Sequence, residues 1–144
     1  MSLDSTAQNT PLGIDLVDEI RARYIELTGS VPPSIEERLT LAVNTGRIKA
    51  IQAIEALRQT LIMENPLDRK TGQLVQFAQL LALGKAEAAK LHAGAARKAG
   101  ASHQELVGVA ELALITSGMP SYALGVEIIT NLIEAEKDSD TSHG

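Results

Sequence analysis

The stretch LDRKTGQLVQFAQLLALGKAEAAKLHAGAARKAGASHQEL, residues 67–106, decides the fold. Its first part, Asp68 to Leu83, is the most apolar segment of the chain, with apolar residues on nearly every side of its last turns. A helix of this kind lies at the centre of a domain, covered by several neighbours. The alanine-rich part that follows predicts a second helix, after a turn or kink at Gly84, and a left-handed stop at Gly100. The stretch therefore predicts an all-α fold.

Helical patterns continue on both sides of this stretch and bring the expected total to about six or seven helices. The other helices are expected over residues 15–28, 34–46, 47–63, 102–117 and 120–136. Two S-x-x-E capping boxes, Ser34 with Glu37 and Ser102 with Glu105, predict helix starts. We find no run of alternating β-branched and polar residues that would indicate a strand. A single domain is expected over residues 14–136, with flexible ends at 1–13 and 137–144.

The composition excludes several classes of function. The chain has 144 residues, no cysteine, no tryptophan and a formal net charge of -5. Without cysteine it has no disulfide, thiolate metal site or thiol-based redox chemistry. The acidic balance and the few aromatic residues argue against nucleic acid as a partner. No apolar run reaches the roughly 20 residues of a membrane span, and residues 1–11 lack the pattern of a secretory signal. We therefore expect a soluble cytoplasmic protein with no membrane partner.

His92 is the main candidate for site chemistry. On a helix it shares a face with small residues, namely Ala88, Ala89, Ala95, Ala96 and Ala99. Small residues let a second helix approach closely, so we expect the imidazole at a helix–helix contact with little water. A neutral imidazole there is an acid–base catalyst if a partner orients it. The alternative is a core histidine bonded to a carboxylate or carbonyl group.

Lys85 precedes His92 by seven residues, which places both on the same face of a helix about 10 Å apart along its axis. A cation and an imidazole at one cavity would suit a small anionic substrate. The alternative is a solvated lysine at a helix start. Glu111 is a candidate partner for His92, and Tyr122 could present its hydroxyl to a cavity or pack as an ordinary aromatic residue.

The remaining charged residues near His92 indicate no site. The side chains of Glu87, Lys90, Arg97 and Lys98 are expected on a solvated face, and that of His103 is expected to be exposed. Only three histidines occur, one of them in the C-terminal tail, and the spacings of known histidine metal sites are missing. We therefore expect no metal and no other cofactor.

Residues 66–134 resemble the carboxymuconolactone decarboxylase-like superfamily, which includes the alkylhydroperoxidase-D type. The resemblance is carried by LDRKTGQLVQFAQLLALG (67–84), KLHAGAARKAGASHQEL (90–106) and SGMPSYALGVEII (117–129), and TGSVPPSIEERL (28–39) is similar to leader helices of such proteins. It implies a helical bundle of the alkylhydroperoxidase-D-like type that self-associates, commonly as a trimer or hexamer, with sites near subunit contacts.

The resemblance implies two chemistries, and this chain departs from one of them. The peroxidase branch carries cysteines seven and four residues before its histidine, where this chain has Lys85 and Ala88. The relay glutamate of that branch falls at Gln73. Thiol-dependent peroxide reduction is thereby excluded. The decarboxylase branch is the better match, through Leu83-Gly84-Lys85 and Leu91-His92.

The leading hypothesis is therefore a cofactor-free lyase that decarboxylates a small carboxylated lactone or keto acid. His92 would donate or shuttle the proton and Lys85 would hold a carboxylate or oxyanion, with Gln73, Glu111 and Tyr122 as substrate-binding candidates. A second hypothesis is an oligomeric binding or scaffold member without catalysis. A helix-turn-helix regulator is disfavoured, because residues 120–136 contain no lysine or arginine for phosphate contacts.

Overall fold

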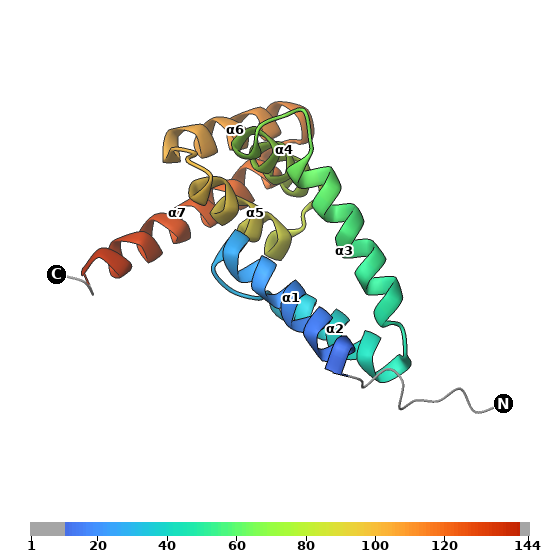
Figure 1. Ribbon diagram of the computed structural model, residues 1–144. Helices are drawn as coiled ribbons and strands as arrows, with labels where there is room; N and C mark the ends of the chain where they lie inside the picture. The colour runs from blue at the N-terminus through green and yellow to red at the C-terminus, as the bar shows by residue number, and fades with distance from the viewer. Residues whose placement is uncertain (1–10, 142–144) are drawn as a thin grey trace. The chain divides into compact units, whose positions relative to one another are not determined.

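The computed structural model of the protein describes residues 11–141, with side chains from Leu16 onward. These residues form seven α-helices and no β-strand (Figure 1), which confirms the all-α prediction. The chain divides into two compact units, with the boundary between Glu64 and Asn65. Each unit has its own buried core, so each is described by itself. The expectation of a single domain over residues 14–136 stays a prediction.

The first unit contains α1 (Pro11–Thr28), α2 (Pro33–Thr45) and α3 (Ile48–Met63). Its core consists of apolar residues from all three helices: Val17, Ile20, Tyr24, Ile35, Leu39, Ala42 and Ile51. A bidentate ion pair also joins α1 to α2. Nε and Nη2 of Arg21 lie 2.9 and 3.0 Å from the two carboxylate oxygens of Glu36. Apolar burial and this half-exposed pair hold the three helices together.

The predicted capping box at Ser34 is wrong, because α2 starts earlier. The helix begins at Pro33, with Pro32 in the N-cap position and no side-chain cap bond. Pro33 fixes its own φ at a helical value and holds Pro32 in an extended conformation. Proline is favoured in the first turn of a helix because its missing N–H would be unpaired there in any case. Ser34 is therefore already inside the helix.

The second unit contains α4 (Arg69–Leu83), α5 (Ala86–Lys98), α6 (His103–Ser117) and α7 (Met119–Thr141). Its core joins Phe77 and Leu81 of α4 to alanines of α5 and α6 and to Ile128 and Ile129 of α7. Helix α4 contacts all three of the other helices, as its apolar sequence predicted. The small side chains of α5 and α6 allow each of these helices to pack closely against α4 and α7.

Local signals in the sequence set the ends of α4 and α6. Asp68 caps α4 by accepting a hydrogen bond of 2.7 Å from the amide of Thr71, which lowers the pKa of its carboxyl group. Gly84 ends the helix with φ 69°, a left-handed conformation that glycine adopts without strain. Ser102 and Glu105 form the predicted capping box of α6. Gly84 therefore separates two helices rather than kinking one.

Helices α6 and α7 approach one another closely at Gly125. A methyl group added to Gly125 would lie 2.7 Å from Cβ of Ala110 and 3.2 Å from a methyl carbon of Leu81. Two carbon atoms in contact need about 3.5–4.0 Å. The absence of a side chain at position 125 therefore lets α7 lie against both α6 and α4.

Both ends of the helical region extend beyond the prediction. Helix α1 begins at Pro11 and α7 continues to Thr141, so residues 11–13 and 137–141 are helical rather than flexible. No glycine or proline follows Glu136 before the last residue of the chain, so nothing in that stretch stops the helix. Residues 1–10 and 142–144, the rest of the predicted flexible ends, lie outside the described residues. Within residues 11–141, no helix is both long and apolar enough for a membrane crossing.

Candidate functional site

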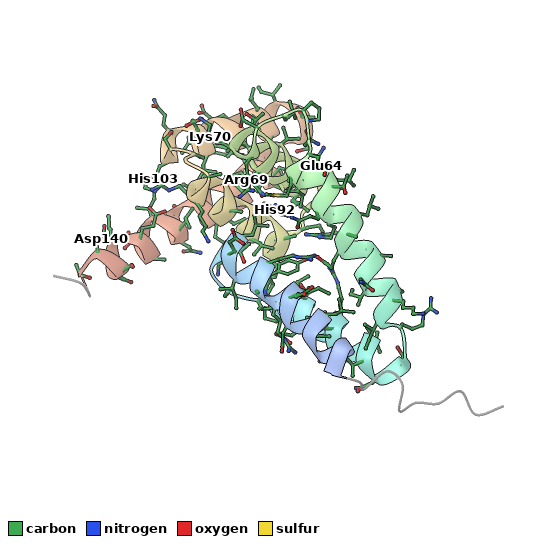
Figure 2. All side chains as sticks on the ribbon, viewed as in Figure 1. Glu64, Arg69, Lys70, His92, His103 and Asp140 are labelled. Atoms are coloured by element: carbon green, nitrogen blue, oxygen red, sulfur yellow. The ribbon has the colours of Figure 1, made fainter. Side chains whose placement is uncertain are left out.

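His92 lies in the middle of α5, and its ring is half-buried (Figure 2). Three of the alanines predicted to share its face, Ala89, Ala95 and Ala96, are buried, and Ala88 and Ala99 are half-buried. The alanine face expected around this histidine is therefore largely buried, and the expected exclusion of water from the ring stays a prediction.

The partner of His92 on α4 is Gln73. Nδ1 of His92 lies 2.7 Å from Oε1 of Gln73, across 19 residues of sequence. The Gln73 side chain is only 2% exposed. A hydrogen bond of this length to a buried side chain orients the ring. The structure thus brings together two of the five residues that the sequence singled out, His92 and Gln73.

Glu111 does not take the place at His92 that the sequence analysis considered for it. Its side chain is exposed on α6, whereas Nδ1 of His92 is bonded to Gln73. Its neighbour Leu112 is exposed as well. Glu111 is therefore not the partner of Nδ1, and its pairing with His92 stays a prediction. A role of Glu111 in substrate binding stays a prediction.

Lys85 and Tyr122 have separate surroundings. Lys85 is exposed at the N-cap position of α5, outside the helix proper. Lys85 and His92 would share a face only on one continuous helix, whereas Lys85 has φ -92° and ψ 81°, which are not helical values. Tyr122 is half-buried and packs against the core of the second unit, as the packing alternative expected. Their roles with a substrate stay predictions.

A polar cluster that the sequence analysis missed lies where α5, α6 and α7 meet. Nε and Nη2 of Arg97 lie 2.8 and 3.1 Å from the two carboxylate oxygens of Glu136. Nη1 of Arg97 donates a hydrogen bond to the backbone carbonyl of Ala101. Nε2 of His103 lies 2.6 Å from Oε2 of Glu136. The hydrogen bond from Arg97 is the main reason why the pKa of Glu136 is lowered. Figure 2 shows His103 beside α7.

Arg97 and His103 are thus half-buried in an ion-pair cluster and not on the solvated face predicted for them. Glu136 follows Arg97 by 39 residues, so no helical spacing could have indicated the cluster. The described side chains include no group of three or more histidine, aspartate or glutamate residues arranged to hold a metal ion. The hydrogen bonds of the cluster link α7 to α5 and α6.

The arrangement at His92 is suited to proton transfer. An imidazole that is hydrogen-bonded at Nδ1 to a buried side chain has a fixed orientation, and imidazole is the side chain best suited to gain and lose a proton at physiological pH. The sulfur nucleophiles needed for peroxide reduction do not exist in this chain. The chemistry available at this place is acid–base chemistry.

Comparisons with known proteins agree with the all-α fold described above. No curated protein matches the chain. Among solved structures, the chain is similar to the crystal structure of a candidate carboxymuconolactone decarboxylase from Burkholderia xenovorans LB400, with a TM-score of 0.72 and 23% identity. The match covers 90% of this chain and 97% of the other, and at this identity it shows the fold alone. The model of the carboxymuconolactone decarboxylase family matches residues 49–130. This match covers α4, α5, α6 and the His92–Gln73 pair, and the chain belongs to the carboxymuconolactone decarboxylase family.

Proposed function

We propose that this chain is a cofactor-free carboxy-lyase that removes CO2 from a small carboxylated lactone or keto acid. The observation that carries the proposal is the hydrogen bond of 2.7 Å between half-buried His92 and buried Gln73. Membership of the family supports this class of reaction. The absence of cysteine leaves the acid–base branch as the one that this chain can perform.

The reaction needs two things from the protein. When the carbon–carboxylate bond breaks, its electron pair moves into the conjugated carbonyl system of the substrate, and CO2 leaves. A proton must then reach the carbon that lost the carboxylate, and His92 is the group in this site that can deliver it. The ammonium group of Lys85 would attract the anionic substrate and hold an oxyanion. The proton that His92 gives up is replaced from water, so the ring acts as a shuttle.

A panel of small carboxylated lactones and keto acids tests the proposal. Compounds that bind the folded protein raise its melting temperature, and those compounds are then assayed for CO2 release. The variant His92→Ala is expected to lose at least about 100-fold in kcat, which is the usual contribution of a general acid–base group. Its assembly and helix content should be unchanged.

The matched control is His103→Gln, which removes an imidazole from the same unit but from the cluster around Glu136. This variant should keep its turnover. Turnover in His92→Ala at the level of the unmodified protein would remove His92 from the mechanism.

A second candidate function, a self-associating binding subunit, is supported by an apolar stripe on the surface. Leu112 and Ile115 are 69% and 80% exposed and lie three residues apart on one side of α6, and Met119, at the start of α7, is 62% exposed. Exposed apolar residues grouped in this way mark protein contacts. A second copy of the chain would present the same stripe, so a symmetric contact is self-complementary.

Sedimentation of the protein tests this second function. We expect a trimer or hexamer of the 15.3 kDa chain, and Ile115→Glu should shift it toward a monomer, because a charge cannot be buried in an apolar contact without a large cost. Gln104→Glu, which adds the same charge at another exposed position of α6, should leave the assembly intact. An unmodified protein that sediments as a monomer would contradict self-association.

A further inference from the structure

The side chain of Gln73 is buried in the second unit and is hydrogen-bonded to His92. Gln73, Phe77 and Leu81 follow one another at four-residue intervals on one face of α4, and all three are buried. Helix α5, which carries His92, packs directly against α4. Among the described side chains, no buried nitrogen or oxygen lacks a hydrogen-bond partner. The amide of Gln73 is oriented so that its oxygen, Oε1, faces Nδ1 of His92.

The chemistry of an amide decides where the proton in this hydrogen bond lies. An amide oxygen accepts hydrogen bonds and has no proton to give. The proton between Oε1 of Gln73 and Nδ1 of His92 therefore belongs to Nδ1. A neutral imidazole carries a single N–H, so the lone pair of the neutral ring is on Nε2. A carboxylate at position 73 could take up the proton, whereas the amide does not titrate.

We infer that Gln73 is a positioning residue that confines proton exchange at His92 to Nε2. The hydrogen bond at Nδ1 persists whether the ring is neutral or charged, so the ring need not rotate when it gains or loses a proton. A proton cannot pass from His92 to position 73, so the ring both gains a proton from water and gives it to the substrate at Nε2. The role of Gln73 in catalysis rests on the proposed function. The tautomer of His92 does not, because it can be measured in a protein without turnover.

Nitrogen NMR of the imidazole rings in the full chain tests the inference. Two-dimensional proton–nitrogen spectra distinguish the two neutral tautomers of histidine, and the His92 signals are assigned by their loss in His92→Ala. At a pH where the rings are neutral, His92 is expected to carry its proton on Nδ1. The variant Gln73→Met keeps the length of the side chain and removes the acceptor. In this variant the His92 ring should shift toward the mixture of the two neutral tautomers that free histidine shows.

Gln79→Met is the matched control, because it makes the same change at an exposed position of the same helix. It should leave the His92 tautomer unchanged. A His92 ring with its proton on Nε2 in the unmodified protein would overturn the inference, and so would a tautomer that Gln73→Met does not alter. If Gln73→Met fails to fold, the spectrum of the unmodified protein decides by itself.

The tautomer measurement and the turnover assay separate the two proposals. A proton on Nδ1 in a protein that turns over none of the panel supports the role of Gln73 and counts against the lyase. Turnover that depends on His92, in a protein whose proton lies on Nε2, supports the lyase and overturns the role of Gln73.

Discussion

At position 24 a tyrosine hydroxyl is buried beside a carboxylate. Tyr24 is 4% exposed, and its hydroxyl donates a hydrogen bond of 3.1 Å to Oε1 of Glu55, which is also buried. The guanidinium group of Arg58 lies 5.7 Å from the centre of the Tyr24 ring. Burial is the main reason why the pKa of Tyr24 is raised to about 12, with the Glu55 carboxylate adding to the rise and Arg58 opposing it.

This raised pKa predicts a loss of stability at high pH. In the unfolded chain tyrosine ionises near pH 10, so the unfolded state releases its proton about two pH units before the folded state does. The stabilisation from Tyr24 is therefore complete below pH 10 and is lost as the pH rises from about 10 to about 12. A difference of this size corresponds to about 2 to 3 kcal/mol. Urea unfolding at a series of pH values measures it.

Tyr24→Phe should remove this part of the pH dependence, because phenylalanine has no proton to lose. It should also lower the free energy of unfolding at neutral pH by about 1 kcal/mol, through loss of the hydrogen bond to Glu55. Tyr122→Phe is the control, and it should retain the decline above pH 10. Equal declines in both variants would contradict the assignment to Tyr24.

The sequence singled out His92 through its alanine face and Gln73 through the spacing of the family that it resembles. Their contact was not predicted and is seen only in the structure. The Tyr24–Glu55 and Arg97–Glu136 pairs were missed because their partners are separated by 31 and 39 residues. Helical periodicity relates positions three to seven residues apart and carries no information about such distant contacts.

At the scale of helices, the two proposed capping boxes had different outcomes. The Ser102 box formed because the preceding Gly100 and Ala101 leave Ser102 as the first residue that can cap α6. The Ser34 box did not form because Pro33 starts α2 one residue before it. A proline next to a capping motif therefore takes precedence over the motif, since it restricts the backbone of two residues at once.

The contact between α6 and α7 predicts opposite effects for the same substitution at two glycines. Gly125→Ala would push Cβ to 2.7 Å from Cβ of Ala110, and we expect it to lower the free energy of unfolding by about 1 to 3 kcal/mol through overpacking. Gly108→Ala, on α6 with open space around the added carbon, should raise it by about 0.5 to 1 kcal/mol, since alanine favours the helix. Denaturant unfolding of both variants measures the two effects. Stabilisation by Gly125→Ala would contradict the close approach.

At the scale of the whole molecule, the two units differ in how much core they bury. The second unit joins four helices around a core with several fully buried residues, including Phe77 and Leu106. We expect the fragment 65–144 to unfold cooperatively on its own in a thermal melt followed by circular dichroism, because it retains that entire core. Before the melt, the fragment should have the helix content that α4 to α7 have in the full chain. A gradual, uncooperative melt of this fragment would instead support the single domain expected from the sequence.

The all-α class and the order of the helices were predictable because they depend on local patterns and turn residues. The match of the family model to residues 49–130 agrees with the resemblance inferred from the central segments. The division at residue 64 was not predicted, although Asn65-Pro66 was expected to break the helix there. Such a division depends on which helices share a core, and this is a property of contacts between distant residues.

The missing side chain at position 125 also limits how this protein can diverge. A larger residue at position 125 fits only if residue 110 becomes smaller or the side chain of Leu81 moves away. The side chains of all three positions would otherwise occupy the same space. Positions 125 and 110 are therefore expected to change together in distant descendants, with bulk gained on one helix offset by bulk lost on the other. The residues at positions 125 and 110, which meet between α7 and α6, would therefore be retained or replaced together.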